Sequence, residues 1–164
     1  MNTTATDTAH LYWNAEWQQA DGRSPWATAE PWVLDHARTL APGSRILDLG
    51  AGIGRHALAL AAMGHKVAAL DASEAAIAAI SAAAPTQAQD ITDLPFDAGA
   101  FDHVLSWNVI YHGDEMIVRR TLAEVARVTR PGGTFMATML SARRIPIERA
   151  KAPGREISRN TWVF

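Results

Sequence analysis

The stretch RILDLGAGIGRH at residues 45–56 decides the fold of this chain. An apolar run predicts a short strand, three closely spaced glycines predict a tight turn, and the residues that follow predict a helix. Because the turn carries no side chains, a ligand can approach its backbone closely. A second apolar run at 65–71, HKVAALD, ends on Asp71, which lies 19 positions after Gly52 and about where a ribose would bind. The pattern predicts a site for a nucleoside cofactor.

Two residues beside the glycine turn distinguish between cofactors. Asp48 stands two positions before Gly50, where its carboxylate would repel the pyrophosphate of a dinucleotide. The nicotinamide-type fingerprint also needs a glycine at position 55, which is Arg55 here. Both departures favour S-adenosylmethionine, which carries an ammonium and a sulfonium but no phosphate.

Five stretches of the chain, in order and with matching spacing, resemble the class I, seven-strand, Rossmann-like S-adenosylmethionine-dependent methyltransferases. They are ILDLGAGIG at 46–54, ALDAS at 69–73, QDITDLPF at 89–96, FDHVLSWN at 101–108 and RPGGTF at 130–135. The matches indicate the superfamily and leave the substrate open. Gly54 and Arg55 before an apolar helix, together with the aromatic-rich start of the chain, are similar to tellurite-resistance-type and related small-molecule methyltransferases.

The alternation of strands and helices predicts an α/β fold with a doubly wound, mostly parallel sheet and helices on both faces. Strands are expected at about 44–49, 66–71, 86–90, 102–107 and 134–140, and helices at about 28–40, 54–63, 74–83 and 114–129. The turn residues Pro131, Gly132 and Gly133 are expected to lead into the last of these strands. The family pattern continues with a helix and two more strands, of which only the start of one, at 161–164, is visible here. The chain is therefore either truncated or a naturally shortened relative.

Three regions are predicted: an aromatic-rich cap segment at 1–27, the cofactor-binding domain at 28–142 and a basic segment at 143–164. The basic segment either meets an acidic partner or is solvated. With the last two strands missing, the strand at 134–140 would form an exposed sheet edge, through which a homodimer could form.

Composition narrows the class of protein. The chain has 164 residues, no cysteine and a net charge of −2, so disulfides, thiolate metal sites and a general affinity for nucleic acid are not expected. The six histidines show no ligand spacing, and no metal is predicted. Without a signal peptide or an apolar run of membrane-spanning length, the protein is expected to be cytoplasmic, with a small-molecule substrate and no membrane partner.

The residues predicted to bind the cofactor lie at the ends of the expected strands. They are Tyr12, Asp48, Gly50, Ala51, Gly52, Asp71, Ala72, Asp90, Ile91, Trp107 and Asn108. Asp48 is expected to orient the ammonium of the methionine part, and Asp71 to accept both ribose hydroxyls unless it only caps a helix. The resemblance implies that Asp90 accepts from the adenine amino group, with Ile91 beside the ring; a surface aspartate in a loop is the alternative.

The sequence indicates fewer residues for catalysis than for cofactor binding. Methyl transfer is a direct displacement, so positioning supplies much of the rate, and a base is needed only if the acceptor must lose a proton. His112 follows the fourth strand and is the candidate base, although a surface or supporting role is an alternative. Two rival functions stay open: a non-catalytic cofactor-binding or partner-binding domain, and a nicotinamide-dependent enzyme.

Overall fold

A five-stranded parallel sheet in the order β3-β2-β1-β4-β5 forms the centre of the molecule. The computed structural model describes residues 9–19, 26–80, 86–88, 90–141, 143, 146, 151, 155–158 and 161–163. The strands are β1 (Arg45–Leu49), β2 (Lys66–Asp71), β3 (Thr86–Ala88), β4 (Phe101–Ser106) and β5 (Thr129–Ala137). The order steps outward from β1 in both directions, so the doubly wound α/β fold is confirmed.

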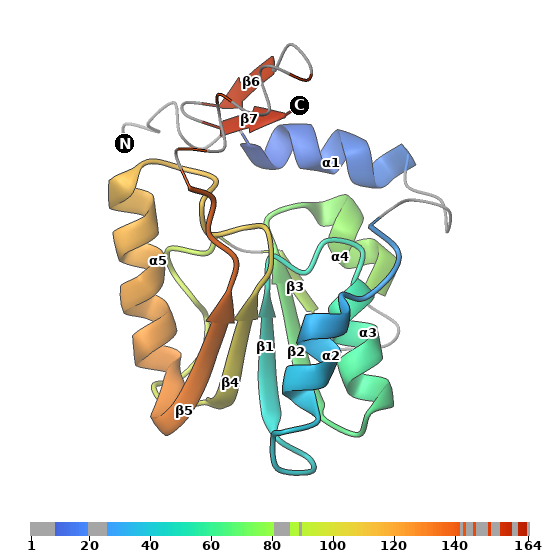
Figure 1. The fold of residues 1–164 in the computed structure, drawn as a ribbon, viewed down its shortest axis with the longest axis vertical. Helices are drawn as coiled ribbons and strands as arrows, with labels where there is room; N and C mark the ends of the chain where they lie inside the picture. The colour runs from blue at the N-terminus through green and yellow to red at the C-terminus, as the bar shows by residue number, and fades with distance from the viewer. Residues whose placement is uncertain are drawn as a thin grey trace.

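Helices cover both faces of this sheet (Figure 1). The helices on the faces are α2 (Pro31–Ala37), α3 (Arg55–Ala62), α4 (Glu74–Ile80) and α5 (Glu115–Val128), and α1 (Ala9–Gln19) precedes them in the chain. Alternate residues of β1 serve the two faces: Ile46 joins the apolar cluster that includes Leu60 of α3, and Leu47 joins the one that includes Val125 of α5. The central strands β1, β2 and β4 are largely buried on both faces, as in other parallel sheets, whereas the residues of β5 are mostly exposed or half-buried.

Helix α1 lies across the carboxyl ends of the strands, apart from the helices that flank the sheet (Figure 1). The sequence predicts an aromatic-rich cap segment at 1–27, but it does not predict where the helix of that segment lies. Because ligands of open α/β sheets bind at the carboxyl ends, α1 covers the edge on which the cofactor site was predicted.

Strand β5 begins earlier than expected. Phe101 pairs with Thr129, and the next pair is His103 with Thr134, so residues 130–133 form a bulge inside the ladder rather than a turn that precedes the strand. The expected turn is therefore wrong. Gly133 is needed at this bulge, since a Cβ there would lie 2.9 Å from the carbonyl oxygen of Asp102.

The last described strands, β6 (Arg155–Ser158) and β7 (Thr161–Val163), pair with each other in an antiparallel sheet of their own. Only the second of them was expected from the sequence. Among the residues that the structure describes, neither extends the main sheet, which therefore lacks the last two strands of the family pattern, as predicted. Much of the predicted segments 1–27 and 143–164 lies outside the described residues, and the three-region division stays a prediction.

Candidate cofactor site

The glycine turn ties the end of β1 to the end of β2. The N–H groups of Gly50 and Ala51 both donate to the carbonyl oxygen of Leu70, at 2.7 and 3.0 Å. Gly50 and Gly52 have φ values of +76° and +54°, a region that side chains disfavour. The turn thus takes the backbone conformation for which the sequence supplies glycine.

The space that the missing side chains leave is filled by other parts of this chain. A Cβ on Gly50 would lie 2.3 Å from Val109, one on Gly52 would lie 3.0 Å from Trp17, and one on Gly54 would lie 2.0 Å from Ile80. The glycines therefore allow the loop after β4, helix α1 and helix α4 to close around the turn. That Gly50 and Gly52 also leave room for a cofactor stays a prediction.

Asp48 is a buried carboxylate with an unsatisfied oxygen. Its side chain is 1% exposed, and its Oδ2 has no hydrogen-bond partner among the described residues. Burial raises the pKa of Asp48 to about 7, although a hydrogen bond from the Ala57 backbone opposes this shift. A buried carboxylate oxygen without a partner is costly unless a cation or donor satisfies it. Asp48 therefore fits a ligand with an ammonium or sulfonium group.

Asp71 bridges the glycine turn and the start of α4. Its Oδ2 accepts from the N–H of Gly52 and its Oδ1 from the N–H of Ser73, both at 2.8 Å. Burial raises the pKa of Asp71, and these backbone hydrogen bonds oppose the rise. Each carboxylate oxygen has a second lone pair, so both can still accept from ribose hydroxyls. Ser73 caps α4, because its Oγ accepts from the N–H of Ala76 at 3.2 Å.

Helix α1 is docked on this site through a polar residue that the sequence analysis did not single out. The Oδ1 of Asn14 accepts from the Ser73 hydroxyl at 2.8 Å and from the N–H of Ala75 at 3.1 Å, so Asn14 also caps α4. No local signal could have found this contact, because Asn14 and Ser73 are 59 residues apart.

Aromatic side chains of α1 cover the glycine turn. Trp13 and Trp17 stack with centroids 5.5 Å apart, and Tyr12 meets Trp13 edge-on at 5.3 Å. Arg55 lies with its guanidinium 5.4 Å from the Trp26 ring and 3.4 Å from a carboxylate oxygen of Glu30. The dense aromatic segment thus packs on the predicted site, which is consistent with the predicted place of Tyr12 beside the cofactor.

His112 stands at the same edge, in the loop after β4. Its ring lies 5.8 Å from that of Trp13 and 4.6 Å from that of Tyr111. Its Nε2 is 2.9 Å from the carbonyl oxygen of Asn108, whereas its buried Nδ1 has no hydrogen-bond partner among the described residues. Burial lowers the pKa of His112. Because a carbonyl only accepts, Nε2 carries the proton and the free Nδ1 carries a lone pair.

Four other residues predicted to bind the cofactor also lie at this edge. Their contacts within the chain point less clearly to cofactor binding. The Oδ1 of exposed Asp90 accepts from the N–H of Thr92 at 2.7 Å, Ile91 packs on the core beneath α5, and Ala72 is exposed. Trp107 packs on the apolar cluster of the other sheet face, which includes Leu60 of α3, and its ring lies 6.1 Å from that of His56. Their contacts with adenine and cofactor stay predictions.

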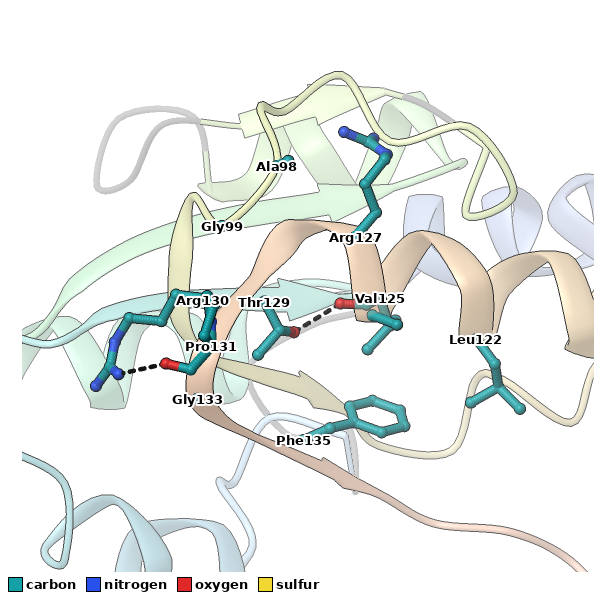
Figure 2. A pocket seen from close by; sticks show the side chains of 11 residues that line it. Ala98, Gly99, Leu122, Val125, Arg127, Thr129, Arg130, Pro131, Gly133 and Phe135 are labelled. Atoms are coloured by element: carbon teal, nitrogen blue, oxygen red, sulfur yellow. Dashed lines mark hydrogen bonds between the residues drawn. The ribbon is translucent and has the colours of Figure 1, made fainter.

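One hollow lies away from this edge. A groove of about 660 Å³ runs between α5 and β5, as Figure 2 shows. Its lining residues are Ala98, Gly99, Leu122, Val125, Ala126, Arg127, Thr129, Arg130, Pro131, Gly133 and Phe135. They come from the loop before β4, the C-terminal half of α5 and β5, so the groove does not belong to the predicted cofactor site.

Within the described ranges, the structure shows neither a group of three or more His, Asp or Glu side chains that could hold a metal ion nor a helix long and apolar enough to cross a membrane.

Comparison with known proteins decides the family. The profile of a family described as "Methyltransferase domain" matches residues 46–133, more than half of the chain. The chain belongs to this family of methyltransferase domains. The match begins inside β1 and ends at the bulge of β5, so it spans the sheet and the glycine turn. The predicted class I fold and S-adenosylmethionine as the cofactor of the family are confirmed.

Two curated relatives and one solved structure illustrate the likeness. A demethylmenaquinone methyltransferase of Clavibacter sepedonicus is 38% identical over 128 residues, which cover 72% of this chain and 51% of the relative. A ubiquinone biosynthesis O-methyltransferase of Xanthomonas campestris is 31% identical over 136 residues, 75% of this chain and 56% of the relative. Phosphoethanolamine N-methyltransferase 1 of Haemonchus contortus, solved with phosphoethanolamine and S-adenosylhomocysteine, superposes with a TM-score of 0.66 at 20% identity, over 80% of this chain and 32% of that one.

This methyltransferase domain spans about half the length of the curated relatives it matches. The narrower likeness to tellurite-resistance-type enzymes is not tested by these relatives and stays a prediction.

Proposed function

We propose that this chain binds S-adenosylmethionine at the carboxyl edge of its sheet and transfers the methyl group to a small-molecule acceptor. The observation that carries the proposal is Asp48, whose buried Oδ2 lacks a partner beside the glycine turn. A cationic ligand would satisfy this oxygen, whereas a pyrophosphate would be repelled. A nicotinamide dinucleotide is therefore disfavoured.

The residues around the turn have distinct roles in this proposal. Asp48 attracts the positive charge of the methionine part, and Asp71 holds the ribose hydroxyls while it fixes the turn through Gly52. Asp90 and Ile91 hold the adenine, and the α1 rings of Tyr12 and Trp13 cover the site and exclude water. When bound, S-adenosylmethionine supplies a methyl group on a sulfonium that a nucleophile can displace directly.

The acceptor side is assigned to His112. Its Nδ1 lone pair lies in a buried position beside Trp13, where it can take a proton from an acceptor hydroxyl as the oxygen–methyl bond forms. The sulfur–methyl bond breaks in the same step, its electron pair stays on sulfur, and the products are a methyl ether, S-adenosylhomocysteine and the imidazolium of His112. The names of the curated relatives, which refer to demethylmenaquinone and ubiquinone biosynthesis, support a small-molecule acceptor.

Calorimetric titration with S-adenosylhomocysteine tests the cofactor site. Wild-type protein is expected to bind, and Asp71→Ala to bind at least about tenfold more weakly, because hydrogen bonds to a charged group contribute ~1.5–3 kcal/mol. Asp97→Asn, which changes an exposed carboxylate in the loop before β4, is the matched control and should bind as wild type does. Undiminished binding by a folded Asp71→Ala protein would refute the assignment.

A non-catalytic binding domain is the second candidate, and one observation favours it. In the described part of the chain, β6 and β7 pair with each other and leave β5 at the edge of the main sheet. The acceptor pocket of such a domain would lack a wall. Turnover of any acceptor in a panel of phenols, quinols and amines, measured as S-adenosylhomocysteine formed, would exclude this candidate.

The same edge supports a homodimer. Phe135 of β5 is 37% exposed and Leu122 of α5 is 42% exposed, so apolar side chains lie beside a strand whose outer side has no partner strand among the described residues. We propose that two copies pair along β5. A monomeric mass in light scattering at a chain concentration of about 100 μM would contradict this pairing.

A further inference from the structure

Asn108 has an unusual backbone conformation at the end of β4. Its φ is +62°, and among the described residues no other non-glycine residue has a positive φ. Asparagine tolerates this left-handed region better than most residues, yet such a conformation persists only where the surroundings hold it.

Thr138 holds it from the neighbouring chain segment. The hydroxyl of Thr138, which immediately follows β5, accepts from the Asn108 backbone N–H at 2.6 Å and donates to the Asn108 side-chain Oδ1 at 3.1 Å. The Thr138 backbone N–H donates to the carbonyl oxygen of Ser106 at 3.2 Å, which keeps the two segments in register. One hydroxyl thus fixes both the main chain and the side chain of Asn108.

The conformation directs a carbonyl at His112. The Asn108 carbonyl oxygen lies 2.9 Å from Nε2 of His112, and the His112 backbone N–H donates to the carbonyl of Val109 at 2.9 Å, so the loop turns back on itself. Since the carbonyl can only accept, it requires the proton on Nε2 and leaves Nδ1 unprotonated. That Nδ1 is buried and has no hydrogen-bond partner among the described residues.

We propose that Asn108 and Thr138 are positioning residues that hold His112 in the Nε2-protonated tautomer, with Nδ1 ready to take a proton from the acceptor. The inference rests on the proposed function, in which His112 is the base, and deepens it in one respect. A fixed, unprotonated Nδ1 serves an acceptor that must lose a proton, such as a phenol or enol hydroxyl, and gives no advantage to an amine that is already unprotonated.

The tautomer can be measured without an acceptor. In protein labelled with ¹⁵N-histidine, long-range proton–nitrogen correlation spectra at pH 7.5 distinguish the two ring nitrogens, and the signals of His112 are identified by their loss in His112→Gln. Wild type is expected to show the Nε2-protonated form alone. Thr138→Val, which keeps the shape but removes the hydroxyl, should give both tautomers, whereas Thr138→Ser should restore the single form.

A pair of variants at Asn108 separates the backbone conformation from the side chain. Glycine adopts a positive φ freely and alanine does not, so Asn108→Gly should keep the single tautomer and Asn108→Ala should lose it. This pair decides the matter if Thr138→Val does not fold. An Nδ1-protonated wild type, a single tautomer in Thr138→Val or in Asn108→Ala, or two tautomers in Thr138→Ser would overturn the inference.

The failure of this inference is distinguishable from failure of the proposed function. S-adenosylhomocysteine binding by the wild type tests the function, and the tautomer of His112 tests the positioning. If the wild-type protein binds S-adenosylhomocysteine but shows both tautomers of His112, the proposed function stands and the positioning role of Asn108 and Thr138 is refuted.

Discussion

Asp48 is costly to the free protein because its charge is buried with one oxygen unsatisfied. Its folded-state pKa, about 7, lies above the ordinary value of 3.8, so its contribution to stability is fully present below pH 3.8 and is lost as the pH rises toward 7. We therefore expect Asp48→Asn to raise the free energy of unfolding by ~2 kcal/mol at pH 7.5. Urea denaturation without cofactor measures this.

Two further measurements test the explanation for Asp48. The gain in Asp48→Asn should shrink between pH 7 and pH 4.5, because the wild-type carboxyl then becomes protonated in the folded state. The same variant should bind S-adenosylmethionine more weakly, since it has lost the charge that attracts the cation. A variant that is no more stable at pH 7.5, or that binds the cofactor as tightly as wild type, contradicts this account.

At the scale of elements, α1 is held over the site by Asn14 and by aromatic contacts. Asn14 joins it to the first turn of α4, and Trp17 of the same helix lies over Gly52. Asn14→Ala removes a cap and an interhelical hydrogen bond, so we expect a loss of ~1 kcal/mol in stability and faster hydrogen exchange throughout residues 9–19.

Gln18→Ala is the matched control for this helix. Gln18 is exposed on α1, and its replacement should leave hydrogen exchange of the helix unchanged. Unchanged exchange in Asn14→Ala as well would show that the aromatic contacts alone hold α1 over the site.

At the scale of the whole molecule, two buried histidines make stability depend on pH. Burial lowers the pKa of His56 and of His103 to about 4, below the ordinary value of 6.5. The unfolded chain therefore binds more protons than the folded one between pH 6.5 and pH 4, and stability should fall as the pH falls through this range. The effect of Asp48 over the same range has the opposite sign.

Variants separate these contributions. The slope of unfolding free energy against pH between 6.5 and 4.5 should be shallower in His103→Gln than in wild type, by up to ~1 kcal/mol per pH unit. Parallel slopes, measured by urea denaturation at several pH values, would show that His103 is not held neutral by burial.

The local elements could be predicted because their signals are local. The end of β2 at Asp71 and the start of α4 after Ser73 agree with the expected positions, since apolar runs and caps act over a few residues. The bulge in β5 was not predicted, because prolines and glycines are typical of both turns and bulges. Only the pairing of β5 with β4 distinguishes the two.

The sequence by itself determined the parallel α/β sheet, the glycine turn and the two acids near the carboxyl ends of β1 and β2, because hydrophobic period and chain conformation are encoded within short segments. Only the tertiary structure decided that α1 lies over the turn, that Asn14 caps α4, and that Thr138 holds Asn108 against His112. These contacts join residues up to 61 positions apart. Their partners are chosen by how the packed elements meet, which no local pattern records.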